Sequence, residues 1–198
     1  KDYDTELGEG VSSDDPAAME AIWKKVLGTD PYYSFVYNGV RMIFLNSNRG
    51  EARTQVCLGC TAEAYCTGSF DDEQLAWFET ELENGDPCIL FFHHPPITDS
   101  PEALFSIAKT FLVREEDAFY DLVETYQDQI LAMFTGHGHI WEKDNMYESI
   151  PVFETSSIGD TNGNMDNIHI VEVNPEEMSI TVTIGREDTH YWSESFEK

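Results

Sequence analysis

The stretches ILFFHHPP (residues 89–96) and ILAMFTGHGH (residues 130–139) decide the fold of this chain. Each starts as a short apolar run and ends in two histidines flanked by proline or glycine. A mostly helical stretch at residues 101–126 connects them, and this order is typical of two parallel strands that are buried on both faces. Because open α/β sheets place their ligands at the carboxyl ends of parallel strands, we expect both histidine clusters at one such edge.

The sequence on either side of this unit predicts a hairpin, two helices and more strands. Asn38-Gly39 is a strong signal for a two-residue hairpin turn. Helices are expected at residues 16–28, which open with proline and close with glycine, and at residues 71–85. The further expected strands cover residues 33–37, 40–45, 152–155, 168–173 and 179–184, with a short tail after them. The fold class is therefore α/β, with a mixed sheet or two packed sheets in one domain over residues 1–198.

The charge of the chain excludes several classes of partner. Eleven Lys and Arg residues against 38 Asp and Glu residues give a formal net charge of −27 in 198 residues. So acidic a surface repels phosphate backbones, and we expect no nucleic-acid partner. No apolar run approaches the roughly 20 residues of a membrane span, so we expect none. A phosphorylated substrate must meet local positive charge, and a bound cation is the expected source because basic side chains are few.

The cysteines and the first residue bear on the cellular compartment. Cys57, Cys60, Cys66 and Cys88 form an even set, and three of them fall within ten residues. This pattern favours disulfides in an extracellular or periplasmic compartment over a redox-active pair or half of a zinc site, and three pairings stay open. The chain starts at Lys1 without a methionine, so we expect a processed or truncated product.

The histidines predict part of a metal site, since imidazole is the commonest metal ligand near neutral pH. His137 and His139 are two residues apart in a chain expected to be extended, so both rings can point the same way. Gly136 and Gly138 let the backbone approach closely. His93 joins them on a loop that two prolines stiffen. The alternative is that these are polar loop residues that satisfy backbone groups at the strand ends.

Five short motifs follow one another between residues 32 and 142. They are YYSF (32–35), VRMIFLNS (40–47), QLAWF (74–78), FHHPP (92–96) and GHGHIWE (136–142). In this order they resemble the calcineurin-like metallophosphoesterases. The Gly-His-x-His followed by an aromatic residue and Glu is similar to the purple-acid-phosphatase-like branch. Each motif is weak by itself, but the ordered set is specific.

The resemblance implies a two-metal site that hydrolyses phosphate esters. His93 and His137 match ligands of the second metal ion and His139 matches a ligand of the first, while His94 would stand beside the site as a proton donor or a supporting group. Such sites hold two divalent or trivalent ions (Fe, Mn, Zn or Mg), which polarise a phosphoryl oxygen and activate the hydroxide that attacks phosphorus in line. The implied substrate is a small phosphorylated molecule, and the implied fold is a two-sheet β sandwich flanked by helices.

The chain departs from the family pattern upstream of residue 32. The family's Asp-x-His, Gly-Asp-x-x-Asp and Gly-Asn-His-Asp/Glu motifs are missing there, and with them the carboxylate that bridges the metals. Partial echoes at residues 159–166 and 188–190 are crowded, incomplete or not preceded by an apolar strand. We therefore expect the C-terminal half of a metallophosphoesterase domain, which lacks its N-terminal strands and is inactive without the N-terminal half as its partner.

Alternatives to this interpretation stay open. One is a non-catalytic binding or structural module that kept the fold, and another is one chain of a two-chain enzyme.

A calcium loop is an option at residues 160–166, where oxygen-bearing side chains alternate from Asp160 to Asp166. Val171 stands where such a loop has Glu, however, and this favours a polar turn. If the N-terminal strands come from elsewhere, the chain by itself should expose an unpaired parallel strand edge.

Overall fold

The computed structural model describes seven segments of the chain, residues 16–49, 68–98, 117–137, 142–155, 168–177, 179–185 and 192–197. The chain divides into two compact units, Lys1–Tyr33 and Ser34–Lys198. The first unit holds helix α2 (Pro16–Leu27), which begins at proline and is followed by Gly28 at a φ of +73°, as the sequence predicts. The single domain expected over residues 1–198 stays a prediction.

The remaining described elements are nine strands, two α-helices and a short 3-10 helix. Strands β1 to β4 cover Tyr33–Tyr37, Val40–Phe44, Cys88–Phe91 and Ile130–Thr135. Strands β5 to β9 cover Glu142–Met146, Ile150–Glu154, Ile168–Asn174, Ser179–Gly185 and Trp192–Glu197. Helices α3 and α4 cover Asp72–Leu82 and Asp117–Thr125, and the 3-10 helix η2 covers Gln127–Gln129.

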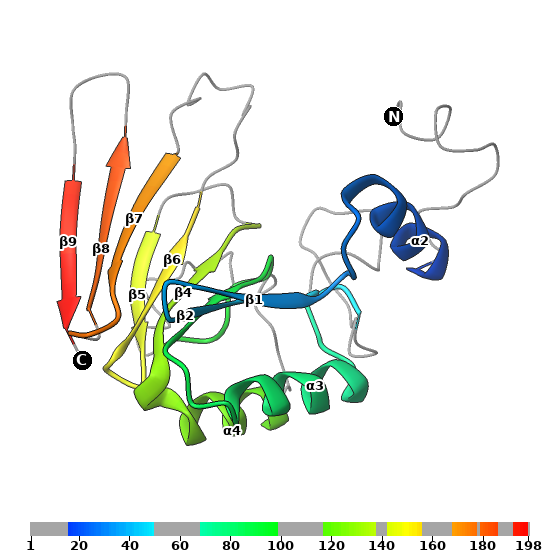
Figure 1. The fold of residues 1–198 in the computed structure, drawn as a ribbon, viewed down its shortest axis with the longest axis horizontal. Helices are drawn as coiled ribbons and strands as arrows, with labels where there is room; N and C mark the ends of the chain where they lie inside the picture. Colours follow the sequence, from blue (N-terminus) through cyan, green and yellow to red (C-terminus); the bar gives the residue numbers. More distant parts are fainter. Residues whose placement is uncertain are drawn as a thin grey trace. The chain divides into compact units, whose positions relative to one another are not determined.

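The strands form two sheets (Figure 1). The first has six strands in the order β1-β2-β3-β4-β6-β5, and the second has three in the order β7-β8-β9. Strands β2, β3, β4 and β6 are parallel, β5 runs antiparallel to β6, and the second sheet is antiparallel. The predicted parallel unit is confirmed, because β3 and β4 are neighbours with Phe91 opposite Phe134.

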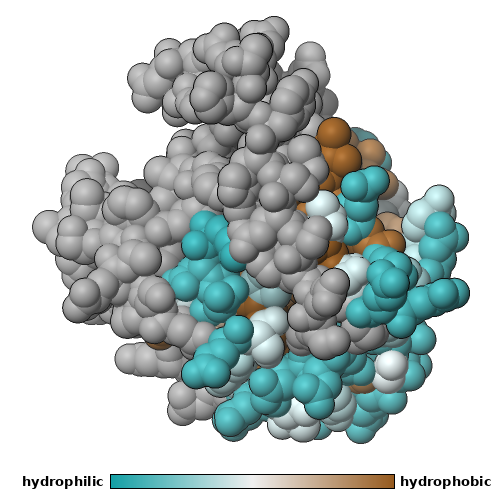
Figure 2. Space-filling model, turned by 90° about the vertical axis from the view of Figure 1, so that its left-hand side faces the viewer, coloured by the Kyte–Doolittle hydropathy of each residue, from teal (hydrophilic) through white to brown (hydrophobic). Residues whose placement is uncertain are grey.

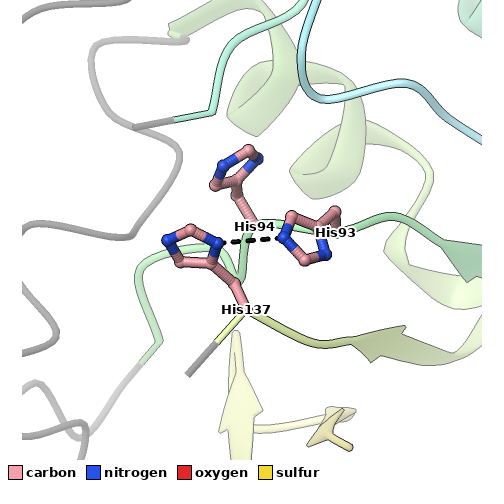
Figure 3. Close-up of side chains that lie close together, drawn as sticks. All are labelled: His93, His94 and His137. Carbon is pink, nitrogen blue, oxygen red and sulfur yellow. Dashed lines mark hydrogen bonds between the residues drawn. The ribbon is translucent and has the colours of Figure 1, made fainter. Parts of the chain in front are cut away.

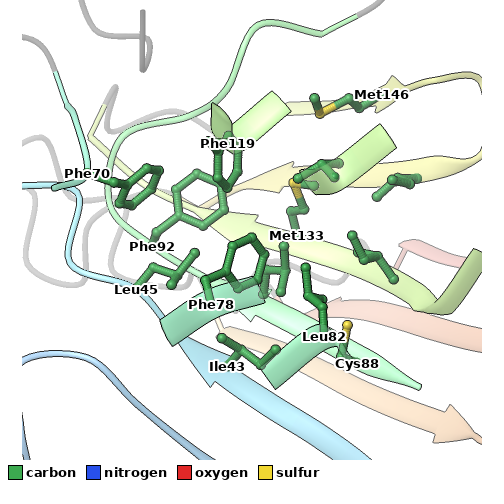
Figure 4. Packing of buried hydrophobic residues seen from close by; sticks show 14 of the residues in the cluster. Ile43, Leu45, Phe70, Phe78, Leu82, Cys88, Phe92, Phe119, Met133 and Met146 are labelled. Atoms are coloured by element: carbon green, nitrogen blue, oxygen red, sulfur yellow. The ribbon is translucent and has the colours of Figure 1, made fainter. Parts of the chain in front are cut away.

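The central strands are buried on both faces, as their apolar runs predict. All six residues of β4 and all five of β6 are buried. On one face of the six-stranded sheet, α3 and α4 contribute Phe78, Leu82 and Phe119 to a core that also holds Ile43 and Met133 (Figure 4). The helices therefore form a layer over this face.

The opposite face of the six-stranded sheet packs against the second sheet. Ile180 and Val182 of β8 are buried in one cluster with Ile89, Leu131 and Phe153 of the first sheet. The unit thus has three layers, namely helices, a mixed sheet and an antiparallel sheet. This is the α/β fold with two packed sheets flanked by helices that the resemblance implies.

The structure also departs from the sequence prediction at the sheet edges. Strand β5 escapes prediction because four of the five residues in its sequence EKDNM are polar, which suits an edge strand that pairs with β6 alone. Strand β9 occupies the expected tail and pairs with β8. The expectation that the chain exposes an unpaired parallel strand edge is wrong for the described strands, because each parallel strand has a neighbour on both sides. The β1–β2 hairpin, which turns through Asn38 and Gly39 at positive φ, covers one edge, and β5 covers the other.

One face of the described segments is drawn by hydropathy in Figure 2. Hydrophilic side chains predominate among the described residues on the face drawn in Figure 2. None of the described helices combines the length and the apolar character that a bilayer crossing requires.

Candidate metal centre

The backbone places His93 and His137 side by side. Strands β3 and β4 pair in parallel register, and the pairing continues beyond their ends. The N–H of Phe92 donates to the carbonyl of Phe134 at 3.1 Å, and the N–H of Gly136 donates to the carbonyl of His93 at 3.0 Å. The two rings therefore reach the same edge of the sheet because of backbone pairing, as expected for the carboxyl ends of neighbouring parallel strands.

Three imidazole rings meet at this edge, those of His93, His94 and His137, and they form the imidazole cluster (Figure 3). Nδ1 of His137 lies 2.9 Å from Nε2 of His93, in a hydrogen bond whose direction depends on the tautomers. The ring centroid of His94 lies 4.5 Å from that of His137 and 4.9 Å from that of His93. One nitrogen of each ring lies within 4.8 Å of a nitrogen of each of the others.

This donor set fits a metal ion. Imidazole nitrogens bind zinc at about 2.0–2.1 Å in tetrahedral geometry, so two of them on one ion lie roughly 3.3 Å apart. The distance between His93 Nε2 and His137 Nδ1 is 2.9 Å, so a small separation of the two rings would bring both nitrogens to ligand positions. Among the described residues the cluster contains no carboxylate, so a pair of ions there would take further, anionic ligands from other residues.

The three rings differ in exposure and in backbone conformation. His93 is exposed, His137 is half-buried, and His94 is only 1% exposed. The φ of His137 is +81°, in the left-handed region that residues other than glycine rarely occupy. The prediction of an extended backbone at His137 is therefore wrong, because β4 ends at Thr135 and the backbone then turns. Backbone strain of this kind concentrates at ligand sites, where the surrounding structure holds it.

His94 is held by two segments that flank residues 50–67. Ser47 Oγ lies 2.8 Å from His94 Nδ1 and accepts the backbone N–H of His94 at 3.2 Å. The ring packs on Gly68, where an added Cβ would lie 2.5 Å from the Cβ and Cγ of His94, so only glycine leaves room for it. A Cβ at Gly136, by contrast, would lie 3.7 Å from its nearest neighbour, Nδ1 of His93. The close approach expected at Gly136 therefore does not require glycine.

The segment that carries Ser47 is anchored to helix α3. Asp71 caps this helix by accepting the N–H of Gln74 at 2.8 Å. The buried side chain of Gln74 then accepts the N–H of Asn46 at 2.7 Å and donates to the Asn46 carbonyl at 3.1 Å, as a neighbouring strand would. Arg49 adds an ion pair with Asp71 at 2.6 Å. The residues on both sides of Ser47 are thus fixed.

The structure brings together three of the four predicted site residues. His93, His94 and His137 share the imidazole cluster, whereas His139 lies outside the described residues. The calcium-loop residues 160–166 and three of the four cysteines also lie outside them. The fourth, Cys88, is buried in the core that α3 and α4 cover.

Sequence reasoning missed four residues at or near this edge. Ser47 and Gln74 stand inside the quoted motifs, but their spacing does not reveal their partners, and Gly68 belongs to no motif. Glu154 is a buried carboxylate, 3% exposed, that lies opposite Thr135 in the sheet. It is not part of the imidazole cluster. These residues become visible only through packing.

Comparison with known proteins bears on the fold. No family model and no curated protein matches the sequence. Among solved structures, a dimetal phosphatase from Danio rerio matches with a TM-score of 0.51 at 14% identity, over 92% of this chain and 64% of that one. A Staphylococcus aureus protein assigned as a 5′-nucleotidase matches with a TM-score of 0.38 at 16% identity, over 84% of this chain and 28% of that one. The chain thus spans less than two thirds of the length of either structure, and its fold is metallophosphoesterase-like.

Proposed function

We propose that this chain is the histidine-bearing part of a metal-dependent hydrolase of phosphate esters. The observation that carries the proposal is the imidazole cluster at the carboxyl edge of β3 and β4, on a metallophosphoesterase-like fold. In this proposal His93 and His137 are ligands of one ion, and His139 is a ligand of its neighbour. The ions are divalent or trivalent, drawn from Fe, Mn, Zn and Mg.

Each residue of the cluster has a physical task in this reaction. His93 Nε2 and His137 Nδ1 face each other, so loss of the proton between them presents two lone pairs to one point. Ions held there would polarise a phosphoryl oxygen and lower the pKa of a bound water, so that hydroxide would be available to attack phosphorus near pH 7. His94 stands beside them as a proton donor or a supporting group. A small phosphorylated substrate suits the site, because the charge of −27 repels polyanions while the ions attract a single phosphate.

We further propose that the anionic ligands come from an N-terminal half, which is continuous with this chain, nicked or separately encoded. One observation supports this proposal, namely that the cluster holds no carboxylate among the described residues. The cysteine content supports an extracellular or periplasmic location.

The test uses the protein expressed from its full coding region and, in parallel, residues 1–198. We expect the complete protein to hydrolyse a generic aryl phosphate. A chelator should abolish this hydrolysis, and added Mn²⁺ or Zn²⁺ should restore it. The 198-residue chain should show little or no hydrolysis. Equal, chelator-sensitive rates for both proteins would contradict the proposal that an N-terminal half supplies the anionic ligands. A complete protein that shows no hydrolysis would contradict the proposed function.

A non-catalytic binding module is the second candidate, and the lack of a carboxylate in the described part of the cluster favours it. The coding sequence upstream of Lys1 separates the candidates. Asp-x-His, Gly-Asp-x-x-Asp and Gly-Asn-His motifs there would support the enzyme, and their replacement by other residues would support the binding module. A separate reading frame for them would support two chains.

A further inference from the structure

The hydrogen bonds around His94 assign its role in the cluster. We propose that Ser47 holds His94 as the tautomer with its proton on Nε2, so that His94 is a hydrogen-bond donor beside the metal ligands and not a third ligand. The identity of the atom that accepts this hydrogen bond rests on the proposed function, whereas the tautomer is argued from the geometry alone.

The tautomer follows from the hydrogen-bonding capacity of Ser47. Its side chain is 1% exposed, so the hydroxyl does not bond to bulk water. A serine hydroxyl has one hydrogen to donate and two lone pairs with which to accept. One lone pair accepts the backbone N–H of His94 at 3.2 Å. Among the described residues, Nδ1 of His94 at 2.8 Å is the acceptor within reach of the hydroxyl hydrogen. The hydroxyl therefore donates to Nδ1, because the opposite direction would leave a buried O–H hydrogen unsatisfied.

This direction determines what His94 offers to the site. A neutral imidazole that accepts at Nδ1 carries its proton on Nε2. In His94 this atom is shielded from solvent, and the ring lies next to those of His137 and His93. Ligation through Nε2 needs its lone pair, so it would move the proton to Nδ1 and leave the hydroxyl hydrogen of Ser47 without an acceptor. We therefore expect the Nε2–H to donate to an oxygen and not to give way to a cation. In phosphoester hydrolysis that oxygen belongs to the phosphoryl group or the leaving group.

The surroundings keep Ser47 and His94 in this arrangement. Gly68 packs so closely on the His94 ring that an added Cβ would displace it. The N–H of Ser69 donates to the carbonyl of Ser47 at 2.8 Å, and Gln74 holds the residue before Ser47 through both of its backbone groups. Ser47 is therefore a positioning residue that acts on the site through His94.

The experiment measures histidine tautomers by ¹⁵N NMR in the complete, metal-free protein at about pH 8.5, where imidazoles are mostly neutral. The signals of His94 are identified by their loss in His94→Gln. We expect a protonated Nε2 and a Nδ1 that accepts a hydrogen bond. Ser47→Ala, and Ser47→Cys as a variant closer in size, should weaken or reverse this preference.

Ser69→Ala is the matched control. Ser69 is also 1% exposed and lies next to the same segment, but its hydroxyl has no hydrogen-bond partner among the described residues. We expect the His94 tautomer to be unchanged in this variant. A proton on Nδ1 in the unmodified protein, or the same tautomer in Ser47→Ala, would overturn the proposal.

Zinc affinity gives a second readout. His94→Gln and Ser47→Ala should lower the affinity less than about tenfold, which is below the loss usual for groups that hold a ligand, while His137→Gln should lower it far more. A loss in His94→Gln as large as that in His137→Gln would make His94 a ligand and overturn the proposal. If even the unmodified protein binds no zinc, the proposed function fails, and the NMR measurement alone decides the tautomer.

Discussion

The two ends of the parallel strands carry polar clusters of opposite construction. At the amino end, Arg41 of β2 donates to Glu81 at 2.7 Å and to Asp86 at 2.6 Å, so opposite charges satisfy one another. At the carboxyl end, the imidazole cluster brings together three side chains of one kind. Charge complementarity stabilises a fold, whereas like groups that converge gain little from one another. The difference agrees with the proposal that the carboxyl end binds metal, whereas the amino end serves stability.

The protonation of Arg41 supports this interpretation. Burial lowers the pKa of Arg41, but the hydrogen bonds that its guanidinium donates to Asp86 and Glu81 outweigh burial and raise the pKa above its ordinary value. The guanidinium therefore stays charged. Its side chain is 15% exposed, and its fork of N–H groups reaches both carboxylates.

The largest expected effect is the loss of activity when an imidazole is removed. In the complete protein we expect His137→Ala and His139→Ala each to lower phosphoester hydrolysis more than about 100-fold, because even groups that only support a metal ligand cost 10–100-fold. His169→Ala is the control, since His169 lies on β7 in the second sheet. Steady-state rates with an aryl phosphate check this. Equal losses at all three positions would show that the site is misplaced.

The stabilisation of the protein by metal should depend on residues of the carboxyl end and not on those of the amino end. Zinc at about 100 times its dissociation constant should raise the free energy of unfolding by about 2.7 kcal/mol. Urea unfolding with and without zinc measures this increment. It should vanish in His137→Ala and persist in Arg41→Met, and an increment that survives in His137→Ala would contradict binding at the cluster.

Removing the guanidinium at the amino end should cost stability and not metal affinity. We expect Arg41→Met to lower the free energy of unfolding by about 1.5–3 kcal/mol, the range for hydrogen bonds to charged groups. Lys24→Met is the matched control, because the ion pair of Lys24 with Asp30 is largely exposed and should contribute less than about 1 kcal/mol. Equal losses in the two variants would show that burial of Arg41 adds nothing.

The smallest expected effect is the pH dependence of the Arg41 contribution. Because the pKa of Arg41 is raised in the folded state, its contribution is complete below the unfolded-state pKa and is lost only as the pH rises through the folded-state value. Both values lie far above neutral pH. The stability difference between the unmodified protein and Arg41→Met should therefore be flat between about pH 6 and pH 10 in urea titrations. A steady slope within this range would show that another group carries the difference.

Much of the fold and part of the site follow from the order of the residues. The apolar runs at β3 and β4 predict strands buried on both faces, since a strand between two layers needs apolar residues at every position. Asn38 and Gly39 predict the hairpin turn because they tolerate positive φ. The meeting of His93 and His137 also follows, because each comes directly after one of two parallel neighbours. These features depend on local pattern and on one pairing rule.

Other features depend on contacts that no local pattern records. Strand β5 forms because it pairs with β6, and Met146 is the single apolar residue in its sequence, so no alternating apolar pattern predicts it. His137 takes its left-handed φ because the chain turns after β4. Ser47 lies 47 residues from His94 in the sequence, and the fold alone brings the hydroxyl to the ring. Burial periodicity is a property of neighbouring residues, whereas a hydrogen bond between distant side chains exists only after the layers have packed.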